Sequence, residues 1–143
     1  SILSHDHDQL TVAMEVFAQQ FKKLLDHRNI TDEHTCLVIG LGNDHVTPDA
    51  LGPMVVDEVI VTRHLYELRP DEVDRSYREV SALAPGVMGM TGIETFDVIE
   101  SLVKKIKPDF LVMVDALASR SITRVNKMIQ ISREIWKEVK NQW

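Results

Sequence analysis

Two aspartates, Asp49 and Asp115, each follow a short apolar run that has the length and composition of a buried strand. Asp49 lies in the segment GLGNDHVTPDALGP, in which glycines end the run and Thr-Pro begins a helix. Asp115 directly follows the run Phe-Leu-Val-Met-Val. A charged residue at the tip of a buried strand is hydrated, paired or functional, because burial of an unpaired charge is costly. These two carboxylates are therefore the first candidates for a chemical role.

The two carboxyl groups could hydrolyse a peptide bond if they met across one crevice. Two like charges a few ångströms apart do not both ionise easily, so one member of the pair keeps its proton. The ionised member can then activate a water molecule while the protonated member donates to a carbonyl oxygen. Structural roles are also open at this point. Asp49 could simply interact with a helix dipole, and Asp115 could cap the turn that follows its strand.

Hydrophobic periodicity and turn residues predict the elements that would position this pair. Thr47 is expected to cap a helix that has Pro48 in its first turn. In chain order the predicted elements are a helix over 10–27, a strand over 36–41, a helix from Thr47 to about Leu65, a charged loop over 69–78, a strand over 79–83, a glycine-rich loop over 84–92, a helix from Thr91 or Gly92 to about Ile106, a strand over 110–114, a strand over 125–131 and a helical tail over 133–143.

The alternation of strands and helices predicts an α/β fold with three layers, in which a mostly parallel sheet carries helices on both faces. The 143 residues are enough for a single domain. Ligands of such sheets bind at the carboxyl ends of the strands. If the strands over 36–41 and 110–114 are parallel neighbours, Asp49 and Asp115 converge at that edge.

Composition argues against several classes of function. A net charge of −6 does not suit a nucleic-acid surface, which needs a basic patch. No apolar stretch approaches the roughly 20 residues that a membrane span needs, and residues 1–9 do not resemble a signal peptide. The single cysteine, Cys36, cannot form an intramolecular disulfide and fits a reducing compartment. We therefore expect a cytoplasmic protein with neither nucleic acid nor membrane as its partner.

Other site motifs find little support. GLGNDH has His45 where a dinucleotide-binding loop has its third glycine, and no G-x-S-x-G or H-x-x-x-H occurs. The segment 5–8, His-Asp-His-Asp, has metal-ligand residue types but lies in a terminal stretch that we expect to be frayed. We therefore predict neither a cofactor nor a metal.

Four longer segments together resemble the germination proteases of spore-forming bacteria. They are VIGLGNDHVTPDALGPMVV, VTRHLYEL, VSALAPGVMGMTGIET and KPDFLVMVDALASRSITRVNKMIQIS. The similarity runs from about residue 8 to residue 132, and motifs of this length are specific. The resemblance implies an atypical aspartic endopeptidase whose two functional aspartates lie in TPDALGP and DALASRS, which are Asp49 and Asp115 in this chain.

The resemblance also implies a biological setting. Members of the family degrade small acid-soluble spore proteins during germination, in the spore core or forespore. They are made as zymogens that process themselves, and they assemble as homotetramers. Their fold is similar to that of the hydrogenase maturation proteases.

Four further residues are candidates for supporting roles in a peptide-binding groove. Asn43 and Arg120 could hydrogen-bond a substrate carbonyl or orient a carboxylate, or they could do plain structural work. Val87 and Met88, in the 84–92 loop, could contact the substrate, or they could pack in the core.

The chain departs from the resembled family at both ends. Members are much longer, and the region that precedes their first helix, with any propeptide, is absent here. After Ser132 the family continues into a glycine-rich segment, whereas this chain reads REIWKEVKNQW. We therefore expect an incomplete protease domain with an atypical tail, in which missing strands would expose a sheet edge and one wall of the groove.

Two other functions stay open. One is a metal-binding relative in the manner of the hydrogenase maturation proteases, with His45 or His64 adding a ligand to the carboxylate pair. The other is a non-catalytic oligomerising module, with Trp136 and Trp143 on its assembly surface.

Overall fold

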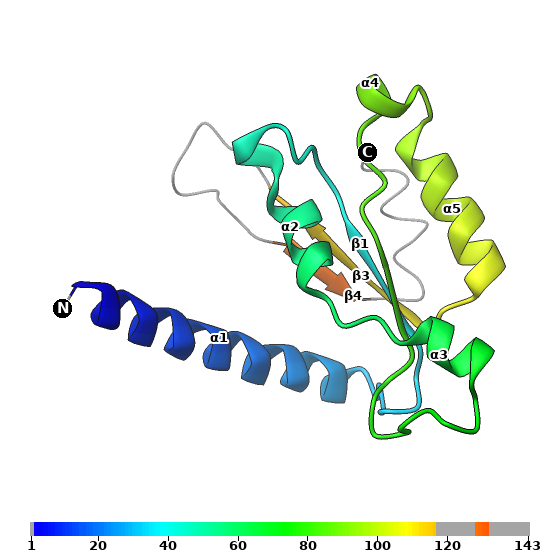
Figure 1. Cartoon of the computed structure of the whole chain (residues 1–143), viewed down its shortest axis with the longest axis horizontal. Coiled ribbons are helices and arrows are strands. Elements are labelled where there is room, and N and C mark those ends of the chain that lie inside the picture. Colours follow the sequence, from blue (N-terminus) through cyan, green and yellow to red (C-terminus); the bar gives the residue numbers. More distant parts are fainter. Residues whose placement is uncertain (1, 117–127, 132–143) are drawn as a thin grey trace. The chain divides into compact units, whose positions relative to one another are not determined.

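The structure is a computed structural model that describes residues 2–116 and 128–131. The chain divides into two compact units, residues 1–32 and residues 33–143, and each is described here by itself. Figure 1 labels most of the helices and strands of both units. The prediction of a single domain stays a prediction.

The first unit is one helix, α1 (Ile2–His27), which begins eight residues before the predicted helix over 10–27. The prediction began where the apolar spacing begins, at Leu10. Residues 2–9 contain no glycine or proline that would end a helix, so the helix extends through them. At its other end Asn29 adopts a left-handed conformation with φ of 57°, and the amide of Ile30 donates to the carbonyl of Leu25 over 2.9 Å. A left-handed residue of this kind is a common way to end a helix.

The second unit is built on a four-stranded sheet. Its strands are β1 (Cys36–Gly40), β2 (Val80–Leu83), β3 (Phe110–Asp115) and β4 (Met128–Ile131). They lie in the order β2-β1-β3-β4, with β1 parallel to both of its neighbours and β4 antiparallel to β3. The predicted mostly parallel sheet is therefore confirmed.

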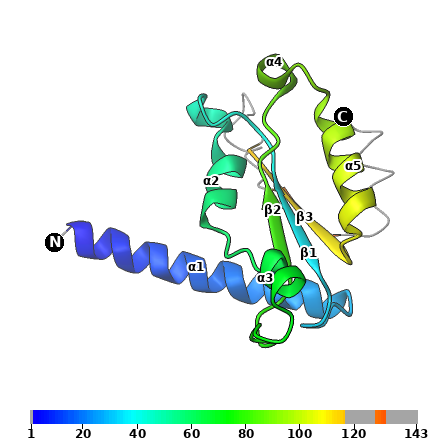
Figure 2. The same cartoon turned by 45° about the vertical axis from the view of Figure 1, so that its right-hand side comes forward.

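Helices cover both faces of this sheet, as predicted. Figure 2 shows α2 (Leu51–Glu58) on one side of the strands and α5 (Thr95–Ile106) on the other. The core lies on the α5 face, where Ile99 is fully buried against alternate residues of β1 and β3. β1 is buried along its whole length and β3 is buried up to Val114, which explains why both strands are continuous apolar runs. The core cluster consists of Leu37, Ile39, Leu41, Ile99, Leu111 and Met113.

The predicted helix from Thr47 to about Leu65 is wrong, because three shorter elements replace it. They are the 3₁₀ turn η1 (Thr47–Asp49), α2, and α3 (Arg63–Leu68). Thr47 is not an N-cap, since Val46 occupies that position. The break over 59–62 consists of four β-branched residues, which favour extended backbone. The buried Thr62 fixes it there, because its amide donates to the carbonyl of Val80 over 2.8 Å.

The predicted loop over 84–92 contains one short helical turn, α4 (Met88–Thr91), which Gly92 ends with φ of +71°. Helix α5 starts later than predicted because the side chain of Glu94 accepts a hydrogen bond from the amide of Asp97 over 3.1 Å. An acceptor at this position caps a helix.

The C-terminal predictions are tested in part. β4 confirms the second half of the predicted strand over 125–131, while 125–127 and the predicted helical tail over 133–143 lie outside the described residues. No helix among the described residues is both long enough and apolar enough to cross a membrane.

Candidate active site

Asp49 is held by a closed turn that follows β1. The amide of Leu41 still donates to Val114 over 2.8 Å, so the chain stays against β3 for one residue beyond the strand. Gly42 then turns the backbone with φ of +118°. The amide of Asn43 lies 3.1 Å from the main-chain oxygen of Asp49 and 2.9 Å from its Oδ2. The turn therefore folds the carboxylate of Asp49 back to the end of β1.

Asp115 is the last residue of β3 and is half-buried. Side chains alternate between the two faces of a strand, so Asp115 is on the same face as Leu111 and Met113. Those two residues belong to the core on the α5 face. Burial raises the pKa of the Asp115 carboxyl above its ordinary value, and the negative charge of Asp49 raises this pKa further. A hydrogen bond from the main chain of Ala116 opposes both effects. The negative charge of Asp49 therefore acts on the carboxyl group of Asp115.

Both aspartates line one cleft of about 320 Å³ at the carboxyl edge of the parallel strands. Its walls come from the turn after β1, the end of β3 and the segment that leads from β2 into α5. Apolar and acidic groups both contribute. The lining residues are Leu41, Gly42, Asp49, Gly86, Val87, Glu94, Thr95, Phe96, Asp115 and Ala116.

Of the four residues predicted to support a peptide-binding groove, the structure places only one, Val87, in the cleft lining among those that it describes. Val87 lines the cleft, whereas Met88 does not and is 58% exposed on α4. Asn43 acts through its main-chain amide, while its side-chain oxygen accepts from the amide of His45 over 2.9 Å. Arg120 lies outside the described residues.

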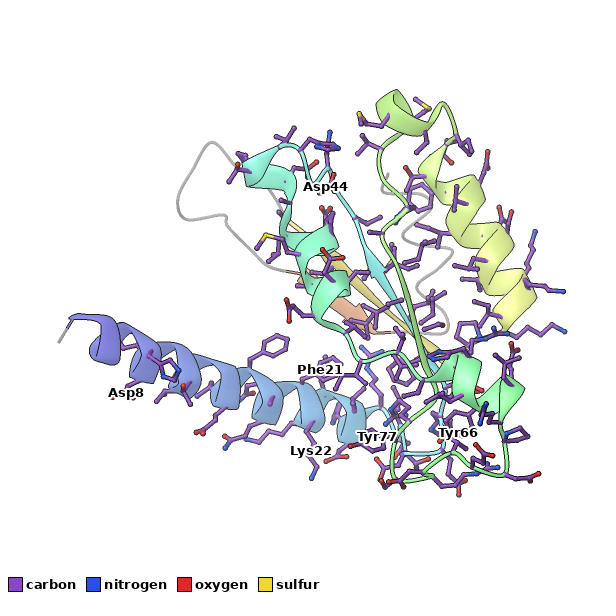
Figure 3. All side chains as sticks on the ribbon, viewed as in Figure 1. Asp8, Phe21, Lys22, Asp44, Tyr66 and Tyr77 are labelled. Carbon is purple, nitrogen blue, oxygen red and sulfur yellow. The ribbon has the colours of Figure 1, made fainter. Side chains whose placement is uncertain are left out.

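Figure 3 orients this end of the unit. Asp44, on the turn that carries Asn43, lies at the opposite end of the strands from Tyr66 and Tyr77. The charged loop over 69–78, which contains Tyr77, is therefore remote from the turn that holds Asp49.

Sequence reasoning missed Glu94, Thr95 and Phe96, which line the cleft. They were predicted to lie inside a helix that in fact begins at Thr95. Gly92 was the available signal, because a glycine favours the end of one element, and an acidic residue soon after it favours a helix start.

Within the part of the chain that the structure describes, no group of three or more histidine, cysteine or acidic side chains could hold a metal ion. The Nε2 of His45 lies 3.5 Å from Oδ1 of Asp44, and both side chains are largely exposed. His64 is exposed on α3.

An α/β unit that brings two interacting carboxyl groups into one cleft has the arrangement that acid–base hydrolysis requires. The family model described as germination protease matches residues 1–135 of the chain, which therefore belongs to the germination protease family.

Three relatives named germination protease illustrate the match. The protein of Halalkalibacterium halodurans is 62% identical over 117 residues, which cover 82% of this chain and 32% of the relative. The proteins of Bacillus velezensis and of a Geobacillus species are 53% and 52% identical over 131 residues, which cover 92% of this chain and 36% and 35% of the relatives. The chain thus spans about a third of the length of these relatives.

Proposed function

We propose that this chain carries the catalytic aspartates of a spore germination endopeptidase. Asp49 and Asp115 act together on one water molecule and one peptide bond. The single observation that carries the proposal is that Asp49 and Asp115 line one cleft. The charge of Asp49, which raises the pKa of Asp115, supports it. Membership in the germination protease family supports the same reaction class.

The environment of each aspartate suggests its role. Asp115 holds the proton, because burial and the neighbouring charge disfavour its ionised form. Asp49 acts as the base, since its carboxylate accepts the amide of Asn43 and keeps a second oxygen for water. Asp49 takes a proton from the water as the water oxygen attacks the carbonyl carbon, and Asp115 donates to the carbonyl oxygen. When the carbon–nitrogen bond breaks, Asp49 gives the proton that it took from water to the leaving amine, and Asp115 recovers its own proton from the former carbonyl oxygen.

The proposed substrate is a small acid-soluble spore protein, bound as an extended segment in the cytoplasm of the spore core or forespore. The apolar residues Val87 and Phe96 line the cleft with the two carboxyls and offer contacts to such a segment. Zymogen processing and a homotetrameric assembly belong to the proposal for the longer protein. So does a fold relationship with the hydrogenase maturation proteases.

Cleavage of a purified small acid-soluble spore protein, followed by intact-mass analysis, tests the function. We expect the parent to cleave and Asp49→Asn or Asp115→Asn to lower the rate by about 10² to 10⁴, which is the range of general acid–base contributions. Asp57→Asn is the matched control, because Asp57 is exposed on α2 and does not line the cleft. A folded Asp115→Asn form that cleaves at the parental rate would overturn the mechanism.

A further inference from the structure

Gly42 and Asp49 approach each other too closely for any side chain at position 42. A β-carbon on Gly42 would lie 2.1 Å from the main-chain oxygen of Asp49 and 3.0 Å from its Oδ1. The first distance is shorter than any ordinary van der Waals contact, and the atom it would meet is backbone. A side chain at position 42 therefore has to displace Asp49.

A second close contact joins Gly40, two residues before Gly42, to Gly52, three residues after Asp49. A β-carbon on Gly40 would lie 2.2 Å from the oxygen of Gly52, and one on Gly52 would lie 2.1 Å from the oxygen of Leu41. Both glycines are buried. The end of β1 and the start of α2 thus touch backbone to backbone, and Asp49 lies in the segment that joins them.

We propose that Gly42 is a positioning residue for Asp49, and that the Gly40–Gly52 contact anchors the segment that carries this carboxylate. The missing side chain at position 42 lets the amide of Asn43 reach Oδ2 of Asp49 at 2.9 Å and keeps the carboxylate in the cleft with Asp115. The catalytic consequence rests on the proposed function, whereas the geometry does not.

Gly92 provides a matched control for substitution by alanine. Gly42 and Gly92 both have positive φ, +118° and +71°, so alanine strains the backbone at either site. A β-carbon on Gly92 would meet nothing within 4 Å, and Gly92 does not line the cleft. Only Gly42→Ala adds a collision with Asp49 to the strain.

The test measures the pKa of Asp115 by carboxyl NMR titration in the parent, Gly42→Ala and Gly92→Ala, each with and without Asp49→Asn. In the parent and in Gly92→Ala we expect Asp49→Asn to lower the pKa of Asp115 by the same amount. In Gly42→Ala the displaced carboxylate moves toward solvent, where screening weakens it, so the lowering is smaller. An equal lowering in folded Gly42→Ala would overturn the proposal.

The Asn43 amide resonance gives a second measurement that needs no Gly42 variant. We expect this resonance to move strongly on Asp49→Asn, because the amide loses a charged acceptor. A resonance that does not respond would remove the Asn43–Asp49 contact on which the positioning role of Gly42 rests, and would overturn the proposal even if Gly42→Ala does not fold.

The cleavage assay separates this proposal from the proposed function. Gly42→Ala is expected to lower kcat more than it changes KM, while Gly92→Ala changes neither. If the parent does not cleave, the function fails, but the titrations still decide the positioning. If the parent cleaves and Gly42→Ala matches it in kcat and in the pKa of Asp115, only the positioning fails.

Discussion

The main-chain amide of Asn43 donates to both the carboxylate and the main-chain oxygen of Asp49, over 2.9 and 3.1 Å. Asn43 follows β1 by three residues, so this contact ties Asp49 to the edge of the sheet at which β3 ends in Asp115. The two carboxyls thus reach one cleft by different routes. Asp115 is the last residue of β3, whereas the turn after β1 folds Asp49 back toward the end of the sheet.

The raised pKa of Asp115 makes the stability of the fold depend on pH. The ordinary value is 3.8, and the native value lies above it. The native state therefore binds this proton more tightly than the unfolded state. The stability that the group contributes is complete below the unfolded pKa and is lost as the pH rises through the native pKa.

Replacement of Asp115 by asparagine removes the ionisable group, and with it the loss of folding stability at rising pH. We expect the Tm of Asp115→Asn minus that of the parent to be more positive at pH 7 than at pH 3, as measured by circular dichroism. Asp57→Asn, at an exposed site, serves as the control. A difference in Tm that is the same at both pH values would contradict the raised pKa.

Thr62→Val should destabilise the second unit by about 1–3 kcal/mol, the usual cost of leaving buried polar groups without partners. The hydroxyl of the buried Thr62 donates to the carbonyl of Arg78 and accepts from the amide of Val80 over 2.8 Å. Valine keeps the shape and the β-branching but satisfies neither group. Urea denaturation measures the change, and Thr47→Val, at an exposed position, should stay within about 0.5 kcal/mol of the parent. Equal midpoints for the two variants would refute this role.

Cys36 should be inert in the native state. Burial raises the pKa of its thiol to about 12, although Arg78 nearby opposes the shift. Because the thiolate is the reactive form, alkylation by iodoacetamide at pH 8 should be negligible in buffer and rapid in urea, as followed by mass spectrometry. Alkylation in buffer at the rate seen in urea would show that the thiol is accessible and ionised.

The strands could be predicted because their signals are local. β1 and β3 are buried apolar runs, and the predicted ends agree with the structure within one residue. The break at 59–62 has a local signal in its four β-branched residues, but the hydrogen bonds that fix it join Thr62 to Val80 in β2, 18 residues further along the chain. Helical periodicity depends only on the residues within one segment, so it does not reveal contacts with a distant strand.

In the candidate site, too, some residues could be predicted from local signals and others depend on the tertiary structure. Asp49 and Asp115 could be proposed from their places at the ends of apolar runs, and the parallel register then brings both ends to one edge. Glu94 and Phe96 were missed, because their exposure to the cleft depends on where α5 begins, and Gly92 was the one local sign of that start. The turn of α4 likewise decides that Val87 lines the cleft and that Met88 does not.

The titration of Asp115 in the parent and in Asp49→Asn tests the central claim most directly, because that claim is an electrostatic interaction between the two carboxyls. Carboxyl NMR should give a pKa for Asp115 above 3.8 in the parent. Asp49→Asn should lower this pKa, and Asp57→Asn should leave it unchanged. A pKa of Asp115 that does not move on Asp49→Asn would contradict the shared site, and with it the proposed two-aspartate mechanism.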